Sequence, residues 1–118
     1  MTNNVVLNIP QMLEDHPDIK EMMVASNENY SFHVLRSKLG EKIEKHYHKN
    51  WAESWFIVEG KFAVWIEGFD PDDLEFIAEP GDFIQIEKGV KHHIETLSET
   101  ATRFAIFKEG VKVIYDGN

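Results

Sequence analysis

Three histidines and one glutamate are the residues of this sequence whose types and spacing could do chemistry. His46 and His48 are separated by one residue, Glu53 follows shortly afterwards, and His92 lies further along the chain. Successive side chains of a strand point to opposite faces, so His46 and His48 are expected on one face, roughly 6 to 7 Å apart. Three neutral imidazoles and one carboxylate form a ligand set for one divalent metal ion. Ligand type alone leaves Fe, Mn, Ni, Co and Zn open.

The alternative interpretation is that the two neighbouring histidines form an exposed polar stretch of a strand. For an isolated pair this would be the default, but here the pair belongs to a longer pattern. Gly40 and Gly60 frame the first three residues, and Gly81 and Gly89 precede His92. This context favours the metal site.

Composition excludes several classes of function. The 118 residues are expected to form one domain, residues 1–118, with a net charge of −9, which argues against nucleic-acid or anionic-membrane partners. A divalent ion with one glutamate ligand would still carry a local charge of about +1 and could attract an anion. Without cysteine there are no disulfides, thiolate metal sites or thiol nucleophiles. The amino terminus lacks a secretory or membrane-anchor pattern, so a cytoplasmic location is expected.

Short apolar runs separated by turn residues predict an all-β fold. One short helix is expected at residues 10–16, because Pro10 suits a helix start and Pro17 ends it, and residues 5–9 could form an edge strand. Ten such strands close most economically as a small barrel or rolled sandwich. The strands are expected at about residues 20–25, 30–38, 42–48, 54–59, 61–67, 74–78, 82–86, 92–97, 101–108 and 111–115.

Strand alternation also predicts which neighbours share the inward face with the ligands. His93 is expected to face away from a site that contains His92. The residues expected to point inward are Glu44, Trp55, Ile57, Ile94 and Thr96.

Two segments resemble the two motifs of the cupin superfamily. Residues 40–60, GEKIEKHYHKNWAESWFIVEG, match the first cupin motif in spacing. Residues 81–96, GDFIQIEKGVKHHIET, resemble the second motif, with Glu87 at a usual proline and Thr96 at a usual asparagine. The resemblance implies a single cupin domain with a double-stranded β-helix, a jelly-roll-like barrel.

The same resemblance implies that His46, His48, Glu53 and His92 hold the metal, with a small-molecule substrate above it in the barrel. It also implies a homodimer through the outer sheet, to which outward apolar residues such as Phe56 and Val58 would contribute. A shorter likeness, over residues 53–60 and 89–96, is to mannose-6-phosphate isomerase-like cupins.

The polar groups around the metal must decide the chemistry, because the ligand set suits several reactions. Candidate catalytic residues are Tyr30, His33 and Arg36, which share one expected strand. Candidate substrate-binding residues are Trp55, Arg103 and Thr96, and Trp65 could form a second wall of the cavity. Each has a structural alternative: arginines pair with surface acids, strand histidines are often structural, and tryptophans fill cores.

The leading hypothesis is an isomerase of a sugar or sugar phosphate, in which the metal stabilises an ene-diolate. Two alternatives stay open. The first is an Fe(II)-dependent dioxygenase of a small diol or carboxylate, because the same ligand set serves that chemistry. The second is a non-catalytic cupin that binds a small molecule or a metal, because no clear acid–base pair accompanies the ligands.

Overall fold

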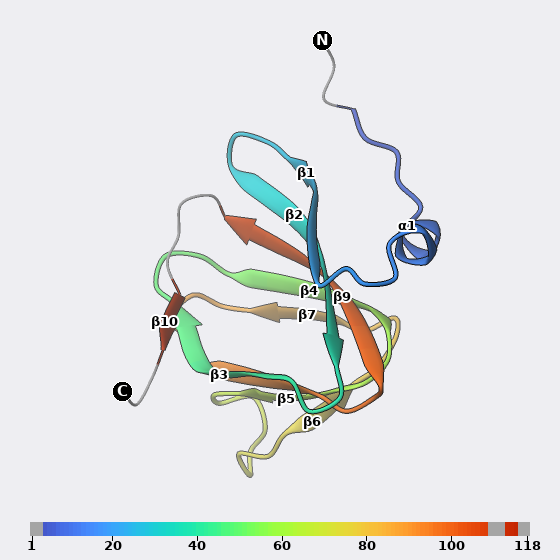
Figure 1. Cartoon of the computed structure of the whole chain (residues 1–118). Coiled ribbons are helices and arrows are strands. Elements are labelled where there is room, and N and C mark those ends of the chain that lie inside the picture. The colour runs from blue at the N-terminus through green and yellow to red at the C-terminus, as the bar shows by residue number, and fades with distance from the viewer. Residues whose placement is uncertain (1–3, 109–112, 116–118) are drawn as a thin grey trace.

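Two antiparallel sheets make up most of the computed structural model, which describes residues 4–108 and 113–115 (Figure 1). The first sheet has the strand order β1-β2-β9-β4-β7 and the second β10-β3-β8-β5-β6. Among the described residues, the elements are α1 (Ile9–Asp15), β1 (Glu21–Ser26), β2 (Tyr30–Lys38), β3 (Lys42–His48), β4 (Glu53–Glu59), β5 (Phe62–Ile66), β6 (Phe76–Ala78), β7 (Phe83–Ile86), β8 (His92–Thr96), β9 (Thr100–Lys108) and β10 (Val113–Tyr115). The all-β prediction is confirmed.

The helix α1 is confirmed, but the edge strand expected at residues 5–9 is wrong. Residues 4–8 have no regular secondary structure, and Ile9 already belongs to the helix. The side chain of Asn8 caps the helix by accepting a hydrogen bond from the backbone N–H of Gln11 at 2.9 Å. Met12 and Leu13 are buried, which fixes the helix against the outer face of the first sheet.

The interior between the sheets contains the main apolar core, and its inward residues follow the predicted alternation. Trp55 and Ile57 on β4 are buried, as are Ile94 and Thr96 on β8. His93, between the two buried positions of β8, is only partly buried. These predictions are therefore confirmed.

The inward orientation expected for Glu44 is wrong, because the pairing of β3 with β8 shifts register between Ile43 and His46. Ile43 packs against the core, and two residues then intervene before the buried His46. Such a bulge breaks the strict two-residue period of a strand. Glu44 is consequently exposed.

Trp65 does not line a cavity opposite Trp55. Trp65 lies on β5 in the second sheet, where it is partly buried and its indole N–H donates to Oδ1 of Asp73 at 2.8 Å. Its ring stacks on His93, with ring centroids 5.5 Å apart. Both residues therefore belong to the outer side of the second sheet.

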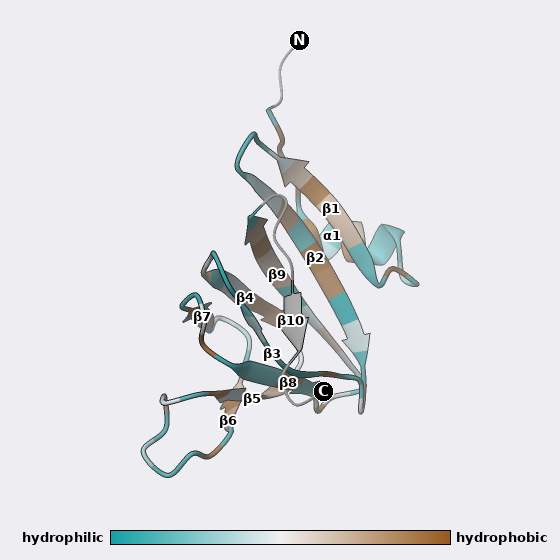
Figure 2. Cartoon of the chain, turned by 90° about the vertical axis from the view of Figure 1, so that its left-hand side faces the viewer, coloured by the Kyte–Doolittle hydropathy of each residue, from teal (hydrophilic) through white to brown (hydrophobic). Residues whose placement is uncertain are grey.

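Strands β1, β2, β9, β4 and β7 lie side by side in the first sheet (Figure 2), and an apolar row crosses the outer face of that sheet. Its members are paired residues on neighbouring strands: Met22, Val34, Phe104, Phe56 and Phe83. The buried residues of α1 pack on Met22, Val34 and Phe104, whereas Phe56 and Phe83 are 44% and 62% exposed. The homodimer stays a prediction, and this uncovered end of the row is where it can be tested.

Candidate metal centre

The four predicted ligands converge in the interior of the molecule. His46 and His48 come from the end of β3, while Glu53 begins β4 and His92 begins β8. All four side chains are buried, and one ligand atom of each lies within 4.8 Å of the others. The bulge in β3 and the crossing of the chain from one sheet to the other bring them together.

Backbone carbonyls orient two of the imidazoles. Nδ1 of His46 lies 2.7 Å from the carbonyl oxygen of Glu44, and Nδ1 of His92 lies 3.0 Å from that of Val90. A carbonyl oxygen only accepts hydrogen bonds, so each Nδ1 carries the proton and each Nε2 keeps its lone pair. Histidines that bind metals are commonly fixed in this way.

The carboxylate of Glu53 connects the ligands to the core. Its Oε1 lies 2.5 Å from Nε2 of His48 and 3.4 Å from Nε2 of His92, and its Oε2 accepts a hydrogen bond from the Trp55 indole. Burial raises the pKa of Glu53, but the hydrogen bonds from His48 and Trp55 and the close approach of His92 outweigh it and hold the pKa well below its usual range. Glu53 is therefore ionised at neutral pH.

Electrostatics keep His46 neutral, as metal binding requires. Burial lowers the pKa of His46 below its usual value, and the hydrogen bond to the carbonyl of Glu44 offsets only part of that effect. The nearby imidazoles of His92 and His48 lower it further. A ligand histidine must be deprotonated to bind a metal, so this environment favours the binding form.

These distances and donor types fit a single divalent ion. Metal–ligand distances of about 2.0–2.2 Å place any two ligand atoms at most about 4.4 Å apart, and the observed limit of 4.8 Å needs only a small contraction. Nε2 of His92 is also buried without a hydrogen-bond partner among the described residues. The cluster could therefore hold a metal ion, and three imidazoles with one carboxylate do not select which ion.

Trp51 covers the cluster, which the sequence analysis did not anticipate. It lies between β3 and β4 and is only 6% exposed, with its ring centroid 4.4 Å from that of His48. Phe107 packs on Trp51 at 5.6 Å, and His33 packs on Phe107 at 4.9 Å. The signal in the sequence was a single large aromatic residue within the otherwise polar segment 49–52.

Of the predicted catalytic residues, the structure brings only His33 to the inner face. His33 pairs with Ala105, which in turn pairs with Trp55, so the three residues share one face of the sheet. Nε2 of His33 lies 2.8 Å from Oγ of Ser31, and its Nδ1 is buried without a partner among the described residues. His33 therefore lies on the cluster side of the sheet, and ring contacts through Phe107 and Trp51 link it to His48.

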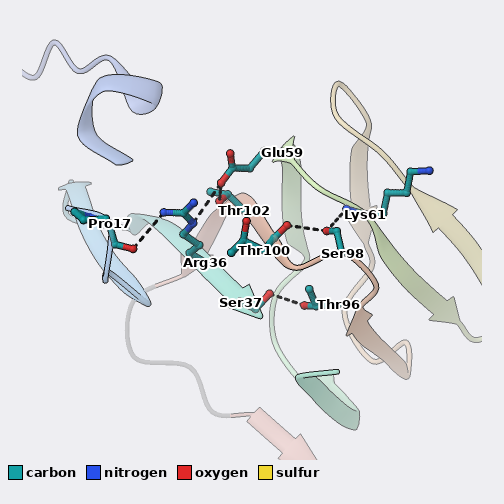
Figure 3. A network of polar contacts seen from close by, with 9 residues as sticks. All are labelled: Pro17, Arg36, Ser37, Glu59, Lys61, Thr96, Ser98, Thr100 and Thr102. Atoms are coloured by element: carbon teal, nitrogen blue, oxygen red, sulfur yellow. Dashed lines mark hydrogen bonds and ion pairs between the residues drawn. The ribbon is translucent and has the colours of Figure 1, made fainter. Parts of the chain in front are cut away.

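The structure does not bring Tyr30 and Arg36 to the cluster. Each is three residues from His33 on a strand with regular pairing to β9, so each occupies the opposite face. Tyr30 is 45% exposed. Arg36 forms an ion pair with Glu59 at 3.3 Å and donates to the carbonyl oxygen of Pro17, as Figure 3 shows.

The predicted substrate-binding residues all lie inside. Trp55 holds the Glu53 carboxylate, and the guanidinium carbon of Arg103 lies 5.2 Å from the centre of the Trp55 ring. Burial lowers the pKa of Arg103, and the attraction of Glu53 and Glu21 opposes that shift. Thr96 is buried at the other end of β8 from His92. Their roles in substrate binding stay predictions.

Comparisons with known proteins agree with this architecture. A family model described as "Cupin domain" matches residues 33–107. No curated protein matches the chain significantly. Among the described residues, no helix has the length and apolar character needed to cross a membrane, and the cytoplasmic location stays a prediction.

Solved structures with similar folds share little sequence with this chain. An RmlC-like cupin with a double-stranded β-helix fold from Methanocaldococcus jannaschii has a TM-score of 0.63 and 19% identity, over 77% of this chain and 83% of that one. The polyketide cyclase RemF from Streptomyces resistomycificus has a TM-score of 0.72 and 15% identity, over 83% and 70%. A predicted sugar phosphate isomerase from Acidithiobacillus ferrooxidans has a TM-score of 0.60 and 21% identity, over 70% and 51%. With the family match across most of its length, the chain belongs to the cupin superfamily, as a small domain with the double-stranded β-helix fold.

Proposed function

We propose that this cupin is a metal-dependent enzyme that isomerises a small polar carbonyl compound, a sugar or sugar phosphate. The observation that carries the proposal is the buried convergence of three imidazoles and one ionised carboxylate. Burying four polar side chains costs free energy unless each finds a partner. A single cation would partner all four at once, which gives a reason for their placement.

The residues of the chain have distinct roles in this proposal. His46, His48, Glu53 and His92 would hold the ion, which would supply positive charge to polarise a carbonyl and stabilise an ene-diolate. Trp55 orients the Glu53 carboxylate through its indole N–H. The ligands would thus keep a fixed geometry when substrate binds.

Proton transfer needs a further group, and His33 is the candidate. It lies on the cluster side of the first sheet, and Nδ1 has no hydrogen-bond partner among the described residues. An imidazole has one nitrogen that can accept a proton and one that can donate it, as a general acid–base catalyst requires. Trp51 and Phe107, which contact His48 and His33 respectively, would limit the entry of water.

The fold likeness adds modest support. One structure with a similar fold is described as a predicted sugar phosphate isomerase, but this chain spans only about half of it. A shared fold does not carry a shared reaction, so the proposal depends on the site.

Incubation of the metal-loaded protein with aldose phosphates in D₂O tests the proposal. Isomerisation through an ene-diolate predicts that deuterium enters at C2, and a His33→Asn variant should incorporate it more slowly with the metal still bound. Absence of deuterium in every substrate of the panel would refute the isomerase proposal. Oxygen consumption by the Fe(II)-loaded protein with a diol or carboxylate would instead favour the dioxygenase alternative, because an isomerase consumes no O₂. Metal or ligand binding without turnover would favour the non-catalytic alternative.

A further inference from the structure

A cavity opens between the sheets beside β2 and β3, at a different place from the metal cluster. It has a volume of about 220 Å³, and its lining includes Ser37 of β2, Thr96 at the end of β8 and Arg103 of β9. The predicted ligand His92 begins β8, whereas Thr96 at the end of that strand lines the cavity, about 13 Å further along at a rise of about 3.3 Å per residue, and Ile94 lines it midway between them. None of the four ligand residues lines this cavity.

Arg103 is a buried cation whose Nε lacks a hydrogen-bond partner among the described residues. The residue is only 5% exposed. Within the described part of the chain, no carboxylate forms an ion pair with it. The guanidinium lies over the rings of Trp55 and Phe62, at 5.2 and 5.8 Å, but aromatic faces do not accept its N–H groups as an oxygen does. A buried charge is strongly unfavourable unless it is paired and hydrogen-bonded.

Hydroxyl groups offer a further donor to the same cavity. Oγ of Ser37 and Oγ1 of Thr96 lie 2.5 Å apart and point toward each other, as Figure 3 shows. One of the two hydroxyl hydrogens makes this bond, so the other hydroxyl can donate elsewhere. Both residues line the cavity together with Arg103. An oxygen of a ligand would satisfy both the hydroxyl and the guanidinium.

The residues that line the cavity carry more positive than negative charge, although the chain as a whole carries −9. Lys20, Arg36 and Lys42 join Arg103 in the lining, with Glu41 as an acidic neighbour. Arg36 and Lys42 form ion pairs with Glu59 and Glu44, so Lys20 and Arg103 supply the unpaired positive charge among the described residues. The carboxylate of Glu41 accepts a hydrogen bond from the backbone N–H of Lys38 at 2.9 Å, so it is engaged with the β2–β3 turn. A negatively charged ligand would therefore meet an excess of positive charge.

We propose that this cavity binds the carboxylate or phosphate group of a small molecule, with Arg103 as the principal donor. Guanidinium groups present a planar fork that matches both anions. The volume suits a compact organic acid or phosphate rather than a large ligand. The site is separate from the metal cluster, so it does not depend on the isomerase proposal.

Titration with inorganic phosphate, and in parallel with acetate, tests the site. Sodium chloride at matched ionic strength serves as the reference for general salt effects. We expect one of the two anions to raise the melting temperature saturably and to shift the amide NMR signals of Ser37 and Thr96. The anion that saturates identifies whether the cavity prefers phosphate or carboxylate. Neither anion saturating, or shifts confined to exposed lysines, would overturn the proposal.

Variants then assign the binding to Arg103. We expect Arg103→Met to weaken the anion by about 100-fold or more, because a buried charge pair loses one partner. Should that variant not fold, Ser37→Ala at a partly buried position is expected to weaken binding about tenfold, through one lost hydrogen bond to a charged group. Lys88→Gln, at an exposed lysine outside the cavity lining, is the matched surface control and should bind as the parent protein does. Loss of anion binding in Lys88→Gln would contradict an effect specific to the cavity.

Discussion

Replacement of His92 by glutamine should remove most of the metal-dependent stabilisation while the fold persists. His92 is fully buried, and its Nε2 faces the cluster without a hydrogen-bond partner among the described residues. Glutamine keeps a similar volume, so the substitution does not leave the large cavity that alanine would. It also removes the imidazole lone pair, which reduces the ligand set to two histidines and Glu53.

The size of the effect follows from mass action. A metal at 100 times its dissociation constant stabilises the folded state by about 2.7 kcal/mol. For 118 residues, an unfolding entropy of about 2.1 cal/mol/K per residue sums to about 250 cal/mol/K, so the melting temperature should rise by about 11 °C. Loss of a residue that hydrogen-bonds to a metal ligand weakens metal affinity by up to about 100-fold. Loss of a ligand itself should weaken metal affinity at least as much. The same metal concentration then gives only about 0.4 kcal/mol, or about 2 °C.

Differential scanning calorimetry of chelator-treated protein, with and without added Zn²⁺, Mn²⁺ or Ni²⁺, measures this difference. His93→Gln is the matched control, because His93 is adjacent in sequence but pairs with Glu75 at 2.9 Å on the outer side of the sheet. That variant should keep the full rise. A rise in His92→Gln equal to that of the parent protein, or its loss in His93→Gln, would refute the assignment of the cluster.

Three further predictions concern pH, a turn and the outer face. Burial lowers the pKa of His46, so the unfolded chain binds more protons than the folded one below about pH 6.5. The metal-free protein should therefore lose stability as pH falls through that value. In thermal melts, His46→Gln should reduce this dependence on pH. Gly60→Ala should lower the free energy of unfolding in urea by about 2 to 5 kcal/mol, because Gly60 has φ +79° and an added Cβ would meet a backbone oxygen at 2.5 Å. Gly40→Ala, at φ +86° but with open space around the added Cβ, should cost only about 1–2 kcal/mol. Equal losses in the two variants would contradict the close contact at Gly60. If the homodimer forms through the uncovered apolar row, Phe56→Ser with Phe83→Ser should give a monomer by light scattering, and a parent protein that is already monomeric would refute the dimer.

Local sequence pattern was sufficient to predict most of the fold and the clustering of the four candidate ligands. The strands matched their expected ranges closely, because each run of apolar residues ends at a turn residue whose backbone preference is intrinsic. The ligands were identifiable because period-two spacing places His46 and His48 on one face whatever the sheet order. The helix start was also predictable, since Asn8 and Pro10 are suitable cap and first-turn residues. The strand expected at residues 5–9 was wrong because it did not take this cap into account.

Features that depend on contacts between distant strands were not predictable. The bulge that turns Glu44 outward arises where β3 pairs with β8, and alternation within β3 alone cannot locate it. The sequence of β2 does not determine which of its two faces points toward the second sheet, so it could not show on which face Arg36 lies. The position of Trp51 over the cluster was not predictable, because its burial depends on Phe107 from the far end of the sequence.

Trp55 connects the two ends of the barrel interior, and this predicts that they are coupled. Its indole donates to Glu53 while its ring lies 5.2 Å from the guanidinium carbon of Arg103, and Glu53 attracts that cation. A divalent ion beside Glu53 would reverse the local charge from about −1 to about +1, so Arg103 would gain more from a bound anion. Phosphate should therefore bind more tightly to the metal-loaded protein, and the metal more tightly in phosphate by the same factor. Calorimetric titrations in both orders measure the two factors. An enhancement that survives Arg103→Met would place the phosphate at the metal instead, and equal affinities with and without metal would show that the two ends act independently.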